Sequence, residues 1–162
     1  MIKEDFAFSY EVYDSLEELT DADASLLSEA RKVTKNAYAP YSHFRVGVIA
    51  LLENGEIVKG SNQENASFPI GLCAERVMLA AAASMFPDVP IITIAISYNN
   101  ENGESAHPIS PCGICRQSLL EYETKLKHAI RIILGGMQGK VYIIERAGML
   151  LPLSFTADEL NV

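Results

Sequence analysis

The positions of the three cysteines constrain this chain more than any other feature. One lies in Cys73-Ala74-Glu75-Arg76, and the other two lie in Pro111-Cys112-Gly113-Ile114-Cys115. Two thiolates separated by two residues at a helix start can point at one metal ion, and a third thiolate from another helix start can join them. Three protein ligands on zinc leave a fourth tetrahedral position for water, as in catalytic zinc sites. The sequence therefore predicts a hydrolytic zinc enzyme.

Length, charge and cysteine count narrow the class of protein further. A chain of 162 residues with 49% hydrophobic content fits one globular domain, 1–162. The 13 Lys and Arg residues against 21 Asp and Glu residues give a net charge of -8, which repels the phosphate backbone of nucleic acids. Three cysteines in a reducing compartment favour metal binding over disulfides. We therefore expect a small-molecule substrate and no nucleic-acid partner.

The sequence predicts a cytoplasmic protein without a membrane segment. The start, Met1-Ile2-Lys3-Glu4-Asp5, lacks the basic region and continuous apolar run of a secretory signal. The longest apolar region, 77–98, is divided by Pro87-Asp88-Val89-Pro90 into pieces too short to span a bilayer.

Hydropathy patterns predict alternating helices and strands. Phe6, Phe8, Tyr10 and Val12 alternate with smaller or polar residues, so residues 1–14 are expected to form an N-terminal edge strand or extension. Helices are expected over 21–37, 73–85 and 112–122, and strands over 44–52, 57–58, 91–97, 129–134 and 140–144. The polar segments 60–71 and 99–109 contain Gly and Pro and are expected to be loops.

The order of these elements explains how the thiols can meet. From residue 57 the chain alternates strand, helix, strand, helix, strand, and right-handed crossovers place both helix starts at the carboxyl edge of the sheet. Cys73 is then expected to face Cys112 and Cys115, and the positive end of each helix dipole favours thiolates. Glu75 becomes a candidate acid and base beside the metal, too far around the helix to be a ligand.

Together these motifs resemble the zinc-dependent cytidine deaminase family, specifically its small homotetrameric type. In zinc deaminases a first His or Cys ligand is followed two residues later by a Glu that does not bind the metal, with Pro-Cys-x-x-Cys further along. The likeness extends from Ala37-Tyr38-Ala39-Pro40-Tyr41-Ser42-His43-Phe44 to Leu150-Leu151-Pro152-Leu153-Ser154-Phe155. It implies an α/β fold: a single three-layer α/β/α domain with a mixed, mainly parallel central sheet.

The resemblance also implies a metal site and a reaction. Cys73, Cys112 and Cys115 would bind one Zn²⁺ per subunit, Arg76 would donate hydrogen bonds to ligand sulfurs, and Glu75 would carry protons. The implied reaction is hydrolytic deamination of free cytidine and 2'-deoxycytidine to uridine and 2'-deoxyuridine. Zinc-bound hydroxide attacks the pyrimidine, ammonia is released, and the pathway served is pyrimidine salvage.

Substrate contacts are implied by the same resemblance. Phe44 would stack near the pyrimidine, and the segment Asn62-Gln63-Glu64-Asn65-Ala66 would bind the nucleoside, with Asn62 and Glu64 on the ribose hydroxyls. Phe155 would close the active site of a neighbouring subunit in a homotetramer. Arg45, Val48, Ile49 and Gln63 depart from the residues usual in the family, which bears on fine substrate preference.

Alternatives remain at this point. The chain could be a non-enzymatic zinc-stabilised module, or an enzyme for a related aminopyrimidine or an aminoguanidine-type antibiotic, and iron could replace zinc. His43, His107 and His128 lack the spacing of metal ligands and are interpreted as structural, with His107 the nearest to Cys112 in sequence.

Overall fold

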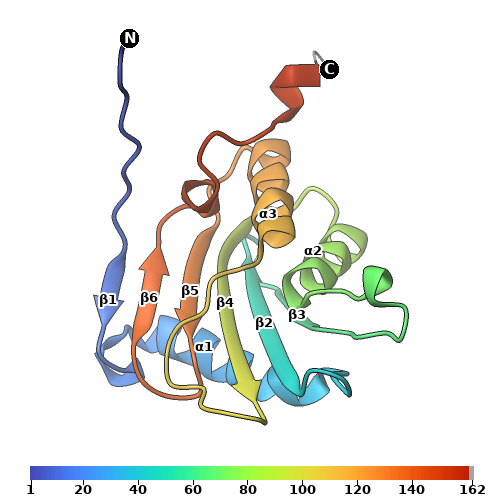
Figure 1. Ribbon diagram of the computed structural model, residues 1–162. Coiled ribbons are helices and arrows are strands. Elements are labelled where there is room, and N and C mark those ends of the chain that lie inside the picture. The colour runs from blue at the N-terminus through green and yellow to red at the C-terminus, as the bar shows by residue number, and fades with distance from the viewer. Residues whose placement is uncertain (161–162) are drawn as a thin grey trace.

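The computed structural model describes residues 1–160 and shows a six-stranded sheet with helices on both faces (Figure 1). Residues 161–162, which the expected domain 1–162 includes, lie outside the described range. The strands are β1 (Glu11–Tyr13), β2 (Phe44–Leu52), β3 (Ile57–Ser61), β4 (Ile91–Asn100), β5 (Arg131–Gly135) and β6 (Val141–Ile144). The α-helices are α1 (Asp21–Val33), α2 (Ala74–Met85) and α3 (Gly113–Leu126). Short 3-10 turns occupy Leu16–Glu18, Thr34–Asn36, Phe68–Ile70, Ala147–Leu150 and Ala157–Leu160.

The sheet is mixed, as predicted, but it is not mainly parallel. Its order is β1-β6-β5-β4-β2-β3, and only β4 and β5 pair in parallel within the described residues. The other neighbours pair antiparallel. The prediction was wrong because β3 and β4, which run in the same direction, do not touch: the β2–β3 hairpin inserts β2 between them. A second hairpin joins β5 to β6.

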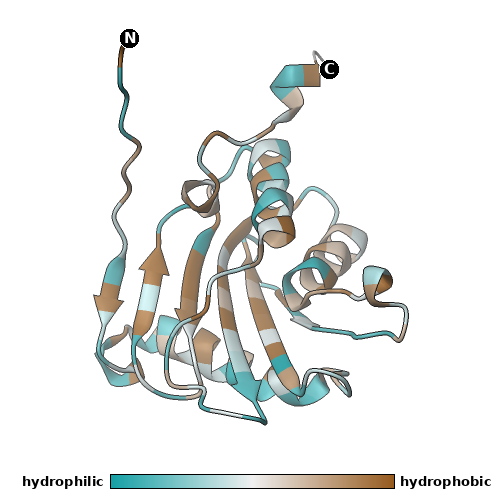
Figure 2. Ribbon diagram, in the orientation of Figure 1, coloured by the Kyte–Doolittle hydropathy of each residue, from teal (hydrophilic) through white to brown (hydrophobic). Residues whose placement is uncertain are grey.

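The three-layer arrangement is confirmed by two apolar clusters on opposite faces of the sheet. On one face, Leu27 and Ala30 of α1 pack with Ile49 and Ile133 of the sheet. On the other face, α2 and α3 contribute Met78, Leu79 and Leu119, which pack with Ile94 and Ile132. Figure 2 shows apolar residues along the central strands between these helix layers. Each strand residue therefore faces one cluster or the other, as the period-two alternation of strands requires.

Two glycines allow helices to lie directly on the sheet. A Cβ on Gly60 of β3 would come within 2.3 Å of the Ala74 carbonyl oxygen, so Gly60 lets the first turn of α2 touch the strand. A Cβ on Gly47 of β2 would come within 2.4 Å of the Ala30 carbonyl oxygen of α1. The contact at Gly60 matters for function because it sets the depth of the helix start that carries Cys73.

The helix boundaries differ slightly from the prediction. The side chain of Thr20 accepts a hydrogen bond from the Asp23 amide at 3.2 Å and caps α1 at the expected place. Instead of continuing to residue 37, α1 ends at Val33 and is followed by the tighter turn Thr34–Asn36, which ends four residues before Pro40. No helix within residues 1–160 has both the length and the apolar content needed to cross a bilayer.

The N-terminal strand is shorter than predicted. It covers Glu11–Tyr13, pairs with β6 at the sheet edge, and leaves residues 1–10 without regular secondary structure. Glu11 lies opposite Ile143, and β6 ends one residue later at Ile144. The preceding residues therefore have no strand beside them, and they leave the body as an extended segment (Figure 1).

Candidate active site

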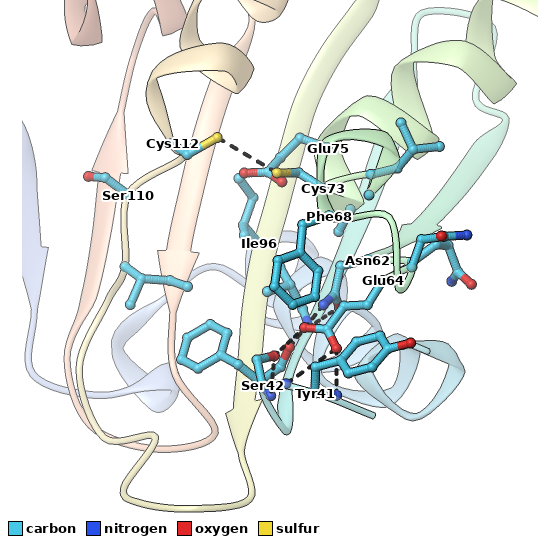
Figure 3. Close-up of a pocket in the computed structure, with 18 residues that line it drawn as sticks. Tyr41, Ser42, Asn62, Glu64, Phe68, Cys73, Glu75, Ile96, Ser110 and Cys112 are labelled. Carbon is cyan, nitrogen blue, oxygen red and sulfur yellow. Dashed lines mark hydrogen bonds between the residues drawn. The ribbon is translucent and has the colours of Figure 1, made fainter. Parts of the chain in front are cut away.

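The three cysteines meet at the starts of two helices, as the sequence predicted. Cys73 is the N-cap of α2, Cys112 is the N-cap of α3, and Cys115 lies in the first turn of α3. The Sγ atoms of Cys73 and Cys112 are 3.7 Å apart (Figure 3). Those of Cys112 and Cys115 are 3.5 Å apart. Among residues 1–160, these three cysteines form the one group of three or more potential ligands that lie close enough together to hold a metal ion.

The sulfur geometry fits zinc. Three sulfurs at about 2.3 Å from a tetrahedral zinc lie about 3.8 Å from one another, close to the observed separations. The three ligand atoms are all sulfurs and lie within 4.8 Å of one another. Among the described residues, no His, Asp or Glu side chain belongs to this group. A tetrahedral ion held here would keep one position for water or substrate, which distinguishes a catalytic site from a closed structural one.

Two of the thiols have strongly shifted acidities. Hydrogen bonding from Cys115 and Cys112 lowers the pKa of Cys73 to about 6, and the nearby charge of Arg76 acts in the same direction. The pKa of Cys115 is raised, first by its hydrogen bond to Cys73 and then by burial. The cluster therefore already favours a thiolate at Cys73, the form that a metal binds.

Glu75 lies beside the thiols in an enclosed position. It is 5% exposed, and burial raises the pKa of its carboxyl above the ordinary range. Figure 3 shows its side chain next to Cys73, directed into the cavity that both residues line. A carboxyl with a raised pKa exchanges protons closer to neutral pH, so Glu75 is suited to general acid and base chemistry.

A cavity of about 710 Å³ runs from the thiols to the start of β2. This volume is within the range of small-molecule sites. Several site residues that were predicted from the sequence line this cavity: Phe44, Asn62, Glu64, Cys73, Glu75 and Cys112. Sequence reasoning assigned no role to several others: Tyr41, Ser42, Val46, Phe68, Leu72, Ile96, Ile109 and Ser110. An available signal was the presence of Phe68, Ile70 and Leu72, three large apolar side chains, in a segment otherwise rich in Ser, Asn and Gly.

The polar side chains at the far end of the cavity are held by the backbone around them. The Asn62 amide accepts from the Val46 N–H at 2.7 Å and donates to the Phe44 carbonyl at 2.9 Å. The Glu64 carboxylate accepts from the Tyr41 N–H at 2.9 Å, from the Ser42 N–H and from the Ser42 hydroxyl. An amide has two N–H donors and a carboxylate about four acceptor sites, so both groups keep capacity for a ligand.

Phe44 belongs to a stack of rings in the cavity wall. Its ring lies 5.0 Å from that of Tyr98, with an interplanar angle of 14°. The Tyr98 hydroxyl is 3.3 Å from Nδ1 of His107, which explains the position of that histidine without a metal. The structural interpretation of His107 is therefore supported, although its partner Tyr98 was not foreseen.

The remaining predicted site residues lie outside the cavity lining. Ala66 is exposed in the loop before α2, and Phe155 is 58% exposed, with its carbonyl accepting from Gln117 at 2.9 Å. Arg76 is half-buried, and within residues 1–160 it forms none of the hydrogen bonds to ligand sulfurs that were expected. It acts on the thiols through its charge, which lowers the pKa of Cys73.

A second arginine, Arg116, supports the cysteine loop and was missed in the sequence. It donates to the carbonyls of Pro111 at 2.9 Å and Leu150 at 3.1 Å. Its position directly after the predicted ligand Cys115 was the sequence feature that could have identified it. Arg116 thereby fixes the residue that precedes Cys112.

Comparison with known proteins gives one consistent family. Residues 20–129 match the model of the cytidine and deoxycytidylate deaminase zinc-binding region. A cytidine deaminase of Halalkalibacterium halodurans is 36% identical over 139 residues, covering 84% of this chain and 96% of the relative. One of Mycobacterium tuberculosis is 34% identical over 146 residues, covering 88% and 96%.

Solved structures agree with the fold. The crystal structure of cytidine deaminase from Burkholderia pseudomallei superposes with a TM-score of 0.71 at 35% identity, covering 85% of this chain and 100% of that one. The three converging thiols and the buried glutamate lie within the matched region. The chain therefore belongs to the cytidine and deoxycytidylate deaminase zinc-binding family.

Proposed function

We propose that this protein hydrolyses free cytidine and 2'-deoxycytidine to uridine and 2'-deoxyuridine with release of ammonia, in pyrimidine salvage. The observation that carries the proposal is the cavity whose one end is lined by Cys73, Cys112 and the buried carboxyl of Glu75. The buried Cys115 completes the zinc-compatible group of thiols there. Cytidine deaminases with 34–36% identity to this chain support the choice of substrate.

The chain's own residues account for the proton transfers of this reaction. Bound at the three thiols, zinc would supply a Lewis acid that lowers the pKa of a coordinated water towards roughly 7. Glu75 accepts a proton from the nucleophile and delivers it to the pyrimidine ring nitrogen, which makes the amino-bearing carbon electrophilic. Glu75 then takes the proton that remains on the added oxygen and transfers it to the amino group, which leaves as ammonia. The burial that raises the pKa of Glu75 suits both directions of transfer.

The other end of the cavity is proposed to hold the nucleoside. Phe44 presents its ring to the pyrimidine, and Asn62 and Glu64 offer the free donor and acceptor capacity described above to the ribose hydroxyls. Ala66 is proposed to contact the substrate from the exposed loop before α2. This arrangement favours a nucleoside over a free base, because a base alone would leave the amide and carboxylate without a ligand.

Arg76 is proposed to offset the charge of the metal site. Three thiolates on a dication give a formal charge of about minus one, which weakens the pull of the metal on water. The charge of Arg76 already lowers the pKa of Cys73. Arg76→Ala should therefore raise the pH at which deamination appears, and an unchanged pH profile would exclude this role.

We further propose a homotetramer in which Phe155 reaches the active site of a neighbouring subunit. Large apolar side chains near the cavity mouth and at the C-terminal tail are exposed in the single chain: Phe68, Ile70, Ile114, Leu153 and Phe155. Burial of such side chains drives association of subunits. The proposed location is the cytoplasm, where reducing conditions keep the three thiols available to the metal.

Ammonia release from cytidine tests the proposal directly. The purified protein should release ammonia from cytidine and deoxycytidine, and Glu75→Gln should retain zinc while turnover falls by several orders of magnitude. Zinc binding without turnover of any aminopyrimidine nucleoside would support the non-enzymatic module instead. Turnover of another aminopyrimidine, without turnover of cytidine, would contradict the proposed substrate but support the proposed hydrolytic deamination.

A further inference from the structure

The N-terminal segment has no role in the site described above. Residues 1–13 lie outside the matched family region 20–129, and residues 1–10 extend away from the body (Figure 1). We define residues 1–13 as the N-terminal arm. We propose that the arm is a self-association element: residues 2–12 of one copy pair antiparallel with residues 2–12 of a second copy, around a two-fold axis at Ala7.

The first argument is an open sheet edge. Within the described residues β1 pairs only with β6, so the outer backbone groups of Glu11–Tyr13 have no strand beside them. Residues 1–10 carry no regular backbone pairing on either side. Such an edge is a template for another strand.

The second argument is a row of uncovered apolar side chains on the arm. Phe6, Phe8, Tyr10 and Val12 are between 41% and 60% exposed. The rings of Phe8 and Tyr10 are 6.2 Å apart, and Tyr10 lies 5.0 Å from Tyr142 of β6, so these rings share one side. Val12 lies opposite Tyr142 and so faces the same side. The apolar row therefore continues the sheet surface beyond its last strand.

The third argument is that the arm sequence is complementary to itself. In a two-fold antiparallel pair, residues opposite each other lie on the same face, so their numbers must share parity. With the axis at Ala7, every pair of numbers sums to 14, and the apolar face joins Ile2 with Val12 and Phe6 with Phe8. Glu4 on this face lies opposite Tyr10, whose hydroxyl can donate to a carboxylate.

The opposite face of this ribbon has complementary charge. Lys3 lies opposite Glu11 twice, once on each side of the axis, and no two like charges are opposed. Moving the axis to Phe8 would oppose Asp5 with Glu11 and Glu4 with Val12. Moving it to Phe6 would oppose Glu4 with Phe8 and leave Lys3 opposite Ser9. Opposite charges across a strand pair stabilise it and like charges destabilise it, so the axis at Ala7 is favoured.

The charge balance of the arm argues against one class of alternative occupant. The arm carries three acidic residues, Glu4, Asp5 and Glu11, against Lys3, which disfavours a phosphate-bearing partner such as a nucleic acid or an anionic membrane.

Disulfide trapping tests this axis. Ala7→Cys places two thiols opposite each other, where Cα atoms about 4.5–5.5 Å apart suit a disulfide. Ser9→Cys is the matched control, because its two copies would lie four residues apart along the ribbon, about 14 Å. With mild oxidant and micromolar protein, Ala7→Cys should give a covalent dimer on a non-reducing gel, well above Ser9→Cys and the unmodified chain.

Charge exchange then tests the register. In the Ala7→Cys background, Lys3→Glu should slow dimer formation by roughly threefold or more, and adding Glu11→Lys should restore it. Lys3→Glu with Glu4→Lys has the same composition but places the lysine on the other face, so it should not restore dimer formation. Thermal melting of each variant checks that the body remains folded.

The result that overturns the proposal is equal trapping of Ala7→Cys and Ser9→Cys, as expected if the arm lies on its own body or on an unrelated protein. Restoration by both double exchanges would equally contradict the register. Because the gel is read without substrate, the outcome does not depend on whether the chain deaminates cytidine.

Discussion

Tyr98 supports Phe44 from the neighbouring strand. Tyr98 of β4 lies opposite Val46 of β2, so Phe44 is its diagonal neighbour, and the two rings stack 5.0 Å apart at 14°. Phe44 lines the cavity, whereas Tyr98 is buried behind it. The position of the ring proposed to face the pyrimidine therefore depends on a residue outside the cavity lining.

Removing the ring of Tyr98 should weaken substrate binding. Tyr98→Leu is expected to raise KM for cytidine about two- to tenfold, the range of an aromatic pair, with little change in kcat. Tyr98→Phe keeps the stack and loses only the hydroxyl contact to His107, so its KM should stay near that of the parent. Steady-state kinetics distinguish the two, and equal KM values for both variants would contradict a role for the stack.

Glu123 should be essential for stability, not catalysis. Its side chain is 2% exposed and accepts from the amides of Ile130 at 2.8 Å, Ala147 at 2.9 Å and Gly148 at 3.0 Å. Glu123→Ala leaves these donors unpaired at about 1–3 kcal/mol each, so a loss of at least about 3 kcal/mol is expected. That corresponds to a Tm lower by about 6–12 °C. Calorimetry should show a much smaller change for the exposed Glu121→Ala on the same helix.

The Asp23–Arg131 pair should make stability depend on acid pH. Arg131 binds both carboxylate oxygens of Asp23, at 2.7 and 2.9 Å, and these hydrogen bonds lower the pKa of Asp23. The pKa of an Asp carboxyl in the unfolded chain is about 3.9, and above that pH the ion pair contributes its full stabilisation. The stabilisation is lost as the pH falls through the lower pKa that Asp23 has in the folded protein.

Asp23→Asn should therefore cost roughly 1–3 kcal/mol at neutral pH. Urea unfolding of both proteins at several pH values should show this difference shrinking below about pH 4. A difference that stays constant down to the acid transition would contradict the assignment.

Arg116 should determine how tightly the metal is held. Because it fixes the Pro111 carbonyl next to Cys112, Arg116→Met is expected to lower zinc affinity by about 10–100-fold. Chelator competition measures this without any activity assay. Lys125→Met removes the same charge from the exposed side of α3 and should leave the affinity unchanged.

Much of the site was predictable because its chemistry lies in short local motifs. Cys73 with Glu75, and Cys112 with Cys115, each occupy one helix start, and a helix start is recognisable from nearby residues. Right-handed crossovers between strands then place the starts of α2 and α3 at the same edge of the sheet. The cavity wall was less predictable, because Tyr98 and Arg116 act through partners on other elements.

The sequence by itself determined the metal ligands, the neighbouring acid and the layered α/β class, because ligand spacing and hydropathy period are properties of single segments. Only the tertiary structure decided the order of the strands, since a turn that joins two strands does not specify which of them, β2 or β3, lies beside β4. It also decided how far β1 extends, because a strand exists only where another strand lies beside it to accept its backbone hydrogen bonds.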